Sequence, residues 1–497
     1  MLKLLTASQT KEADNHTIKA KNITSLELME DAANAFVRAF LEEIPNIDTS
    51  ISIYCGIGNN GADGLAIARL LKNHAYDRLS VKIARFSSKE SPDFNENLKR
   101  LHLTGIPISE INNVNSFPVE QAELIIDGLI GSGLNKPLEG NLKALVDHLN
   151  QLNKKVIAID IPTGFPCEGP LDPIASILKA NLCICFQRPK INFFFPESER
   201  ALDRFKTVNI GLDEQFIQSR SSKWELLEAD DIHHIIKVRK PFSHKGSYGH
   251  TLIIAGNTET MGAALLCADA CLHSGAGLTT ACIPEGGYTA MNCYAPEVMI
   301  LPRSVKTTFE KYNAIAIGPG LGTNQEASDL LDQLLNSGKS PLLIDADAIN
   351  LLASNPELLK KLPKDCIICP HVKEFDRLFG HSNSWWERLN LAIKKAQELK
   401  IIILLKNRYT FIFCPDGKVL INPTGNPKMA VGGMGDVLCG MIAAFLAQSY
   451  SIKESAILAT YLHGAAGDHL SKMNSIPPRY IIQELPKIIK KHNIHKT

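Results

Sequence analysis

The sequence predicts an α/β protein with two domains, each built on a largely parallel sheet. Short apolar runs alternate with helical patterns along the whole chain, which is typical of α/β architecture. At 497 residues the chain is too long for one ordinary core. A polar stretch over residues 213–230 separates two sets of expected strands. We therefore expect an N-terminal domain over residues 1–215 and a C-terminal domain over residues 224–497.

The expected strands of both halves end in glycine or in an acid. In the first half they lie at residues 51–55, 81–86, 124–127, 156–160 and 182–186. In the second half they lie at residues 251–255, 279–283, 314–317, 342–345, 367–369, 401–405 and 410–414. Ligands of open α/β sheets bind outside the carboxyl ends of the strands, so we expect one site in each half.

The composition bounds the function classes. A hydrophobic content of 45% and a charged content of 21% are ordinary for a globular protein. The net charge of +1 gives no strong attraction to nucleic acid or to an anionic membrane. No signal peptide and no apolar run of about 18 residues is present. We interpret the scattered cysteines as reduced thiols of a cytoplasmic protein. We expect its partners to be small-molecule substrates rather than nucleic acid or membrane.

Three strand ends of the first half carry polar groups. A glycine-rich loop over residues 56–64 precedes a helix expected at 65–71, and its glycines permit positive φ and close approach to a phosphate. Asp127 and Asp160 each end an apolar strand, so we expect both in one crevice. Acids at strand ends often only cap the next helix, but three such ends in one domain favour a site.

The second half contains a glycine cluster that runs into a helix. Gly432, Gly433 and Gly435 precede apolar residues at helical spacing over 437–446. Free backbone N–H groups at a helix start attract an anion, and Asp436 lies at the same point. A carboxylate beside a phosphate site suits a base that takes a proton from a hydroxyl attacking a phosphoryl group. The alternative is a glycine-rich helix start with Asp436 as a cap.

Over residues 4–212 the chain resembles the NAD(P)H-hydrate epimerase family, with a Rossmann-like three-layer fold. The resemblance rests on Gly58-Asn-Asn-Gly-Ala-Asp-Gly64, Asp127-Gly-Leu-Ile-Gly131-Ser-Gly133 and Asp160-Ile-Pro-Thr163-Gly164. It implies that Asp160 is catalytic, and that Asn60, Asp127 and Thr163 hold a potassium ion. It implies substrate contacts from Asn59, Asn60, Gly61, Ala62, Asp63, Gly131, Ser132, Gly133, Leu134, Asn135, Lys136 and Pro137. Ala62 replaces a family glycine and would cost about 1 kcal/mol if it needed positive φ.

Over residues 224–491 the chain resembles the ADP-dependent NAD(P)H-hydrate dehydratases, which have a ribokinase-like fold. The motifs include Gly318-Pro-Gly-Leu-Gly322, Asp345-Ala-Asp347, Pro370-His371, Leu405-Lys406 and Gly432-Gly-Met-Gly-Asp436. The resemblance implies that Asp436 is the base and that Ala263, Gly320 and His371 touch the hydrate. It implies nucleotide contacts from Lys406, Asn407, Arg408, Tyr409, Thr410, Gly433 and Gly435. Asn407 stands where the family has glycine, and Asn tolerates positive φ better than most residues.

Together the two resemblances imply a bifunctional enzyme that repairs hydrated NADH and NADPH. Its expected co-substrate is ADP, with Mg²⁺ and potassium as ions and a homo-oligomer as the assembly. Two alternatives stay open at this point. The first half could be a binding module without activity, or the second half could be a small-molecule kinase fused to a cofactor-binding domain.

Overall fold

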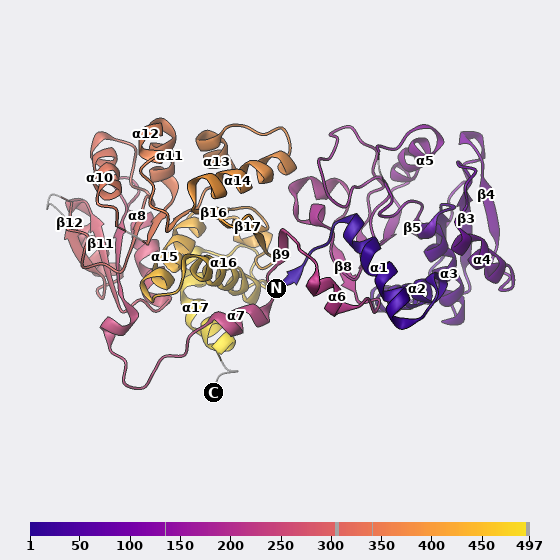
Figure 1. The fold of residues 1–497 in the computed structure, drawn as a ribbon, viewed down its shortest axis with the longest axis horizontal. Coiled ribbons are helices and arrows are strands. Elements are labelled where there is room, and N and C mark those ends of the chain that lie inside the picture. The colour runs from indigo at the N-terminus through magenta and orange to yellow at the C-terminus, as the bar shows by residue number, and fades with distance from the viewer. Residues whose placement is uncertain (135, 304–307, 340, 494–497) are drawn as a thin grey trace. The chain divides into compact units, whose positions relative to one another are not determined.

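The computed structural model describes residues 1–134, 136–303, 308–339 and 341–493. The chain divides into two compact units (Figure 1). The N-terminal unit comprises Lys3–Ser222 and Ser384–Trp386. The C-terminal unit comprises Met1–Leu2 and the other described residues that follow Ser222. No helix among the described residues is long and apolar enough to cross a membrane.

A parallel sheet of seven strands lies at the centre of the N-terminal unit. Its order is β4-β3-β2-β5-β6-β7-β8, and every pair is parallel. The strands are β2 (Ile51–Cys55), β3 (Leu79–Ala84), β4 (Ile108–Ile111), β5 (Leu124–Gly128), β6 (Lys155–Ile159), β7 (Leu182–Phe186) and β8 (Phe205–Val208). Because all strands run the same way, their carboxyl ends share one edge, where the first site lies.

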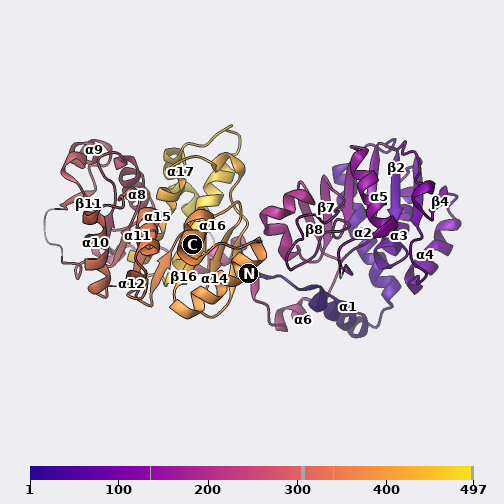
Figure 2. The ribbon, with the colours of Figure 1, turned by 90° about the horizontal axis from the view of Figure 1, so that it is seen from above.

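Helices cover both faces of this sheet, which gives the three layers that the sequence predicts (Figure 2). Ile53 of β2 packs in a core with α2 (Ser25–Glu43), α3 (Asn59–Asn73) and α4 (Pro92–His102). Tyr54, the next residue along β2, faces the opposite core with α5 (Gly140–Gln151). Successive strand residues point to opposite faces, so a strand buried on both sides is apolar throughout.

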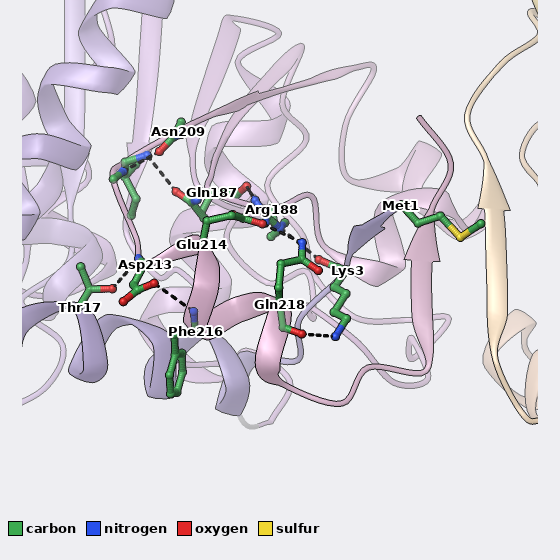
Figure 3. Close-up of polar contacts among 12 residues, drawn as sticks. Met1, Lys3, Thr17, Gln187, Arg188, Asn209, Asp213, Glu214, Phe216 and Gln218 are labelled. Atoms are coloured by element: carbon green, nitrogen blue, oxygen red, sulfur yellow. Dashed lines mark hydrogen bonds and ion pairs between the residues drawn. The ribbon is translucent and has the colours of Figure 1, made fainter. Parts of the chain in front are cut away.

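Two further helices close the unit, and polar contacts fix them (Figure 3). These are α1 (Ala7–Lys21) and α6 (Glu214–Ser219). The backbone N–H of Asp213 donates to Thr17 Oγ1 at 2.9 Å, and Asp213 Oδ1 accepts from Phe216 N at 3.0 Å. Glu214 also forms an ion pair with Arg188. The start of the polar stretch that follows residue 212 is therefore a docked helix of the N-terminal unit.

The C-terminal unit contains an eleven-stranded sheet among its described residues. The order is β1-β9-β18-β17-β16-β15-β14-β13-β10-β11-β12, and only the β16–β17 and β17–β18 pairs are antiparallel among the registers observed. The strands are β1 (Leu2–Lys3), β9 (Trp224–Leu226), β10 (His250–Ile254), β11 (Leu278–Ile283), β12 (Met299–Pro302), β13 (Ala314–Ile317), β14 (Leu342–Ile344), β15 (Cys366–Ile368), β16 (Ile402–Leu405), β17 (Thr410–Phe413) and β18 (Val419–Asn422).

Helices α8 and α15 pack closely against each other in this unit. A Cβ atom on Gly440 of α15 would lie 2.1 Å from the carbonyl oxygen of Cys267 on α8, so only glycine permits this approach. The helices of the unit are α7 (Ala229–Ile235), α8 (Met261–His273), α9 (Tyr288–Tyr294), α10 (Gln325–Asn336), α11 (Ala346–Ser354), α12 (Pro356–Leu359), α13 (Val372–Phe379), α14 (Trp385–Leu399), α15 (Met434–Ala447), α16 (Ile452–His469) and α17 (Pro478–Asn493).

The expected elements agree with the structure where the strands are central. The strands expected at 51–55, 182–186 and 314–317 have those bounds, and the other expected strands differ by one or two residues. The sequence did not predict β1, β4, β8, β9, β12 and β18, which are short or carry polar residues. The expected loop over 56–64 is wrong from Asn59 onward, because α3 begins there.

Candidate active sites

Asp127 and Thr163 form the buried centre of the first site. Asp127 is fully buried on β5, and its carboxylate accepts from Thr163 Oγ1 at 2.7 Å and from Thr163 N at 2.8 Å. Burial raises the pKa of Asp127 to about 6 despite these bonds. The β5 and β6 strands are neighbours, so the strand-end pattern brings these two residues together.

Asn60, in the first turn of α3, lies against the chain that follows Asp127, at Gly128 and Gly131. A Cβ atom on Gly131 would lie 2.8 Å from Asn60 Oδ1, so the loop after β5 passes directly over the amide. The Asn60 Nδ2 atom is buried and has no hydrogen-bond partner. The two ends of an amide are interchangeable by rotation, so a buried cation could take its oxygen as a ligand. Amide, hydroxyl and carboxylate oxygens suit a hard cation, and this donor set fits potassium.

Close backbone packing explains Gly56, which precedes α3, and Gly61, which lies in the first turn of that helix. A Cβ atom on Gly56 would lie 2.1 Å from Leu129 O, and one on Gly61 would lie 1.7 Å from Gly56 O. Ala62 lies inside α3 and is not among the residues with positive φ, so it carries no backbone strain from the replacement of glycine. Asn135 lies outside the described residues, and Gly131, Ser132, Gly133, Leu134, Lys136 and Pro137 flank it along the loop after β5.

Asp160 forms an ion pair that the sequence did not predict. It follows β6 with φ at 63°, in the left-handed region that few residues other than glycine adopt. Lys190 Nζ lies 2.6 Å from Asp160 Oδ1, and Phe186 N donates to the same oxygen at 2.9 Å. Burial lowers the pKa of Lys190, but the charge of Asp160, the nearby Cys167 and Cys185 and the hydrogen bond to Asp160 together raise it. Both contacts use Oδ1, so Oδ2 is the oxygen that a substrate could reach.

Asp63, on the next turn of α3, adds a second carboxyl group to this region. Burial raises its pKa well above the usual value, and the charges of Asp160 and Asp14 raise it further. Asp14 and Lys190 were both missed by the sequence analysis. The available signal for Lys190 was a basic residue between the apolar strand at 182–186 and the apolar run at 193–195.

Asp436 lies at the glycine-rich start of α15, as the sequence predicts. Gly433 has φ at 95° and begins the helix, so Asp436 is the third helical residue. Burial raises the pKa of Asp436 to about 7, and the charge of Asp345 adds to this rise while Lys406 opposes it. A carboxyl group with a pKa near neutrality suits proton transfer at physiological pH.

Lys406 and Asp345 form a buried ion pair beside this helix start. Lys406 Nζ lies 2.7 Å from Asp345 Oδ1, and Asp345 is 1% exposed. The same ammonium group lies 3.6 Å from the position of a Cβ atom on Gly435. A cation therefore faces the backbone amides that an anion would use. This pairing was not predicted, because 61 positions separate the two residues along the chain.

Ala263 and Gly320 lie next to each other, as a shared substrate slot requires. Gly320 has φ at 56°, and a Cβ atom on it would lie 3.0 Å from Ala263 Cβ and 2.7 Å from Thr260 O. His371 has a structural role at the start of α13, where its Nδ1 accepts from Glu374 N at 3.2 Å. Its ring is about half exposed, so one side remains open to a ligand.

The segment after β16 connects this strand to its antiparallel neighbour β17 without a glycine. The backbone of Lys406 forms an isolated parallel β-bridge with that of His371. Asn407 Oδ1 accepts a hydrogen bond from Arg408 N at 2.7 Å. Asn407 is not among the residues with positive φ, so the replacement of glycine costs nothing at this turn. The Arg408 guanidinium lies over the Tyr409 ring, with 4.6 Å to its centroid, and Thr410 begins β17.

The fold and the two sites define a two-domain α/β enzyme. One unit presents an ion-paired carboxylate at a sheet edge, and the other presents an acid with a raised pKa at a glycine-rich helix start. The chain belongs to the family of bifunctional NAD(P)H-hydrate repair enzymes. This assignment rests on relatives that match nearly the full length of the chain.

Comparisons with known proteins cover both units. Residues 251–491 match a family model described as NAD(P)H-hydrate dehydratase, and residues 25–192 match one described as YjeF-related protein N-terminus. The bifunctional NAD(P)H-hydrate repair enzyme of Moorella thermoacetica is 32% identical, over 94% of this chain and 92% of its own length. The Escherichia coli enzyme of the same name is 31% identical, over 94% and 89%. A ribokinase-like superfamily protein of Enterococcus faecalis matches with a TM-score of 0.51 and 32% identity, over 55% of this chain and 98% of its own.

Proposed function

We propose that this chain repairs hydrated nicotinamide cofactors by two successive reactions. The N-terminal unit epimerises the R and S forms of NADHX and NADPHX. The C-terminal unit dehydrates the S form to NAD(P)H and converts ADP to AMP and phosphate. The observation that carries the proposal is Asp436, a carboxyl base with a pKa of about 7 at a glycine-built helix start.

The chemistry of dehydration explains the need for such a base. The C6 hydroxyl of the hydrate is a poor leaving group, and phosphorylation by the nucleotide makes it a good one. Asp436 takes the hydroxyl proton, and the amides near Gly433 and Gly435 hold the transferred phosphate. Lys406 supplies a cation for the nucleotide phosphates. Ala263, Gly320 and His371 hold the hydrate.

The remaining assignments extend the same proposal. Mg²⁺ binds together with ADP, because the negative phosphates would lie near Asp345 and Asp436 and need a positive counter-charge. Asn60, Asp127 and Thr163 hold a potassium ion that fixes the substrate loop. A cytoplasmic location agrees with the twelve cysteines, all of which are free thiols. The homo-oligomer stays a prediction, and Phe242, which is 100% exposed, is a side chain that such an interface would cover.

The decisive assay incubates the full chain with mixed R and S hydrate, Mg²⁺ and ADP, and follows the return of NADH absorbance. Complete recovery supports both activities. If NADH is recovered only from the S hydrate and the R hydrate remains, the N-terminal unit is a binding module without epimerase activity. Absence of recovery, with nucleotide consumed on another hydroxyl compound, would favour the kinase alternative.

A fragment of residues 224–497 is expected to consume only the S hydrate. Its strands from β9 onward and its core belong to one unit. The fragment lacks β1 and the ion pair between the Met1 amino group and Asp231, at 2.5 Å, so its Tm should fall modestly. Calorimetry and NADH recovery check both points. An insoluble or inactive fragment, beside an active full chain, would show that this unit does not fold independently.

Potassium is expected to raise the Tm of the protein. A ligand that binds only the folded state stabilises by about 2.7 kcal/mol at a hundredfold excess over its Kd. Thermal unfolding in potassium chloride is compared with unfolding in choline chloride at equal ionic strength. Asp127→Asn should lose the difference, and the exposed Asp31→Asn in the same unit should keep it. Equal Tm values in both salts would remove the ion from the proposal.

Dehydration is expected to rise with pH through about 7, because the base must be ionised. Burial and the Asp345 charge raise the folded-state pKa of Asp436 from 3.8 to about 7. The folded state therefore binds this proton more tightly than the unfolded chain, and stability falls as pH rises across that window. The measurement is kcat/KM for the S hydrate, which reports the free enzyme. A flat or falling profile from pH 6 to 8 contradicts the assignment.

A further inference from the structure

Arg303 is a cation of the C-terminal unit that no reaction step above uses. It directly follows β12, so it lies at the carboxyl edge of the eleven-stranded sheet. Its Nη2 donates to Ala255 O at 2.8 Å and also to Gly256 O. These two residues follow β10, and β11 separates β10 from β12 in the sheet. The guanidinium therefore reaches across the carboxyl ends of neighbouring strands, which is where open α/β sheets bind ligands.

The carbonyl groups that hold this guanidinium also border the slot formed by Ala263 and Gly320. Gly256 N donates to Pro319 O at 2.8 Å, and Pro319 directly precedes Gly320. On its other side, a Cβ atom on Gly256 would lie 2.9 Å from Ala264 Cβ, in the residue after Ala263. Gly256 thus contacts both walls of the slot, and its carbonyl oxygen accepts from the guanidinium. The cation lies beside the place that the hydrate is proposed to occupy.

The hydrogen bonds of Arg303 leave its charge without a bound anion. Glu326 of α10 acts on this charge, but no carboxylate of the described residues forms an ion pair with it. The Nε atom is buried and has no hydrogen-bond partner in the described part of the chain. A buried donor without an acceptor is costly, and the guanidinium stays charged. Since the side chain is only half-buried, a phosphate can reach its forked N–H groups and supply the missing acceptor.

The strand order indicates how far Arg303 lies from the reacting groups. Asp345, which pairs with Lys406 beside the start of α15, directly follows β14. Ala255 directly follows β10, and β13 lies between these two strands. Neighbouring strands are about 4.8 Å apart, so the two strand ends are separated by roughly 10 Å. In the hydrate, one ribose separates the nicotinamide ring from the pyrophosphate. A ring held near Asp436 can therefore extend its pyrophosphate to the guanidinium, away from the nucleotide phosphates.

We infer that Arg303 binds the pyrophosphate of the hydrated dinucleotide and so sets the affinity of the C-terminal unit for its substrate; this rests on the proposed function. The alternative is that Arg303 only satisfies the carbonyl groups at the end of β10. A contact remote from C6 is equally strong in the ground state and in the transition state, so it lowers KM and leaves kcat unchanged. A purely structural contact would raise stability and leave KM unchanged.

The test measures dehydration of S-NADHX and S-NADPHX by the full chain at saturating ADP and Mg²⁺. Arg303→Met should raise KM about tenfold to a hundredfold, with kcat near the wild-type value. The rise should be the same for both hydrates, because both contain the pyrophosphate. Arg239→Met is the matched control, since Arg239 Nη2 also donates to a backbone carbonyl, Gly275 O at 2.5 Å, before β11 at the opposite edge of the sheet. The control should keep the wild-type KM, and thermal unfolding should show whether each variant is folded.

Arg303→Lys keeps a cation and protects the test against a variant that fails to fold. Its KM should lie between those of the wild type and Arg303→Met, because an ammonium group cannot bind a phosphate with two parallel N–H groups. Added salt should raise the wild-type KM more than that of Arg303→Met. A wild-type KM in either variant would overturn the inference, and so would a rise confined to NADPHX, which would place the 2′-phosphate there. A full chain that dehydrates neither hydrate would instead overturn the proposed dehydratase function itself.

Discussion

Asp436→Asn is expected to slow dehydration of the S hydrate by about 10²–10⁴-fold, which is the usual loss when a positioned base is removed. The carboxyl group lies at the start of α15, where Gly433 and Gly435 leave backbone amides free for a phosphate. Burial and then the charge of Asp345 raise its pKa to about 7, so it can accept the C6 hydroxyl proton at physiological pH. Asparagine keeps the shape and cannot accept that proton.

The same variant should still bind ADP, and it should bind as tightly as the wild type or more tightly. Removal of a negative charge relieves repulsion with the phosphates, and the Lys406–Asp345 pair stays in place. The test pairs S-hydrate turnover with calorimetric binding of ADP. Asp365→Asn, an exposed aspartate of the same unit, is the matched control and should behave as the wild type. Near-normal turnover in Asp436→Asn, or complete loss of ADP binding, would show that Asp436 is not the base.

Asp160→Asn is expected to abolish acceleration of R-to-S exchange while S-hydrate dehydration continues. The Asp160 carboxylate lies 2.6 Å from Lys190 Nζ and forms an ion pair with it. Removing one partner of a buried ion pair typically costs about 3–5 kcal/mol, because the other charge is left unpaired. The variant therefore loses a catalytic group, and the unpaired Lys190 also lowers the stability of the N-terminal unit.

A double variant separates these two effects. Asp160→Asn with Lys190→Met removes the stranded cation, so the N-terminal unit should regain stability without regaining exchange. Chromatography of the two epimers gives the exchange rate, and thermal unfolding gives the stability. Exchange that returns with stability in the double variant would reduce Asp160 to a structural residue. Exchange that stays absent in a stable double variant would confirm its catalytic role.

Local patterns predicted much of the fold and part of both sites. Apolar runs located the central strands, because a strand buried on both faces is apolar throughout. They did not locate β4, whose middle residues Ser109 and Glu110 are exposed, or the two-residue strand β1. The start of α3 was also placed too late, because glycine and asparagine in a helical first turn have the composition of a loop.

By itself the sequence determined the two-domain α/β class, the strand-end acids Asp127 and Asp160, and Asp436 at its glycine-rich helix start. These features depend on neighbouring residues, so spacing and composition are enough to reveal them. Tertiary structure alone decided the partners: Lys190 for Asp160, and Asp345 for Lys406. It also decided the raised pKa values of Asp14 and Asp436, because burial and the charges of distant segments set the cost of ionisation. A sequence states which groups can ionise, and only the packed chain places the charges that act on them.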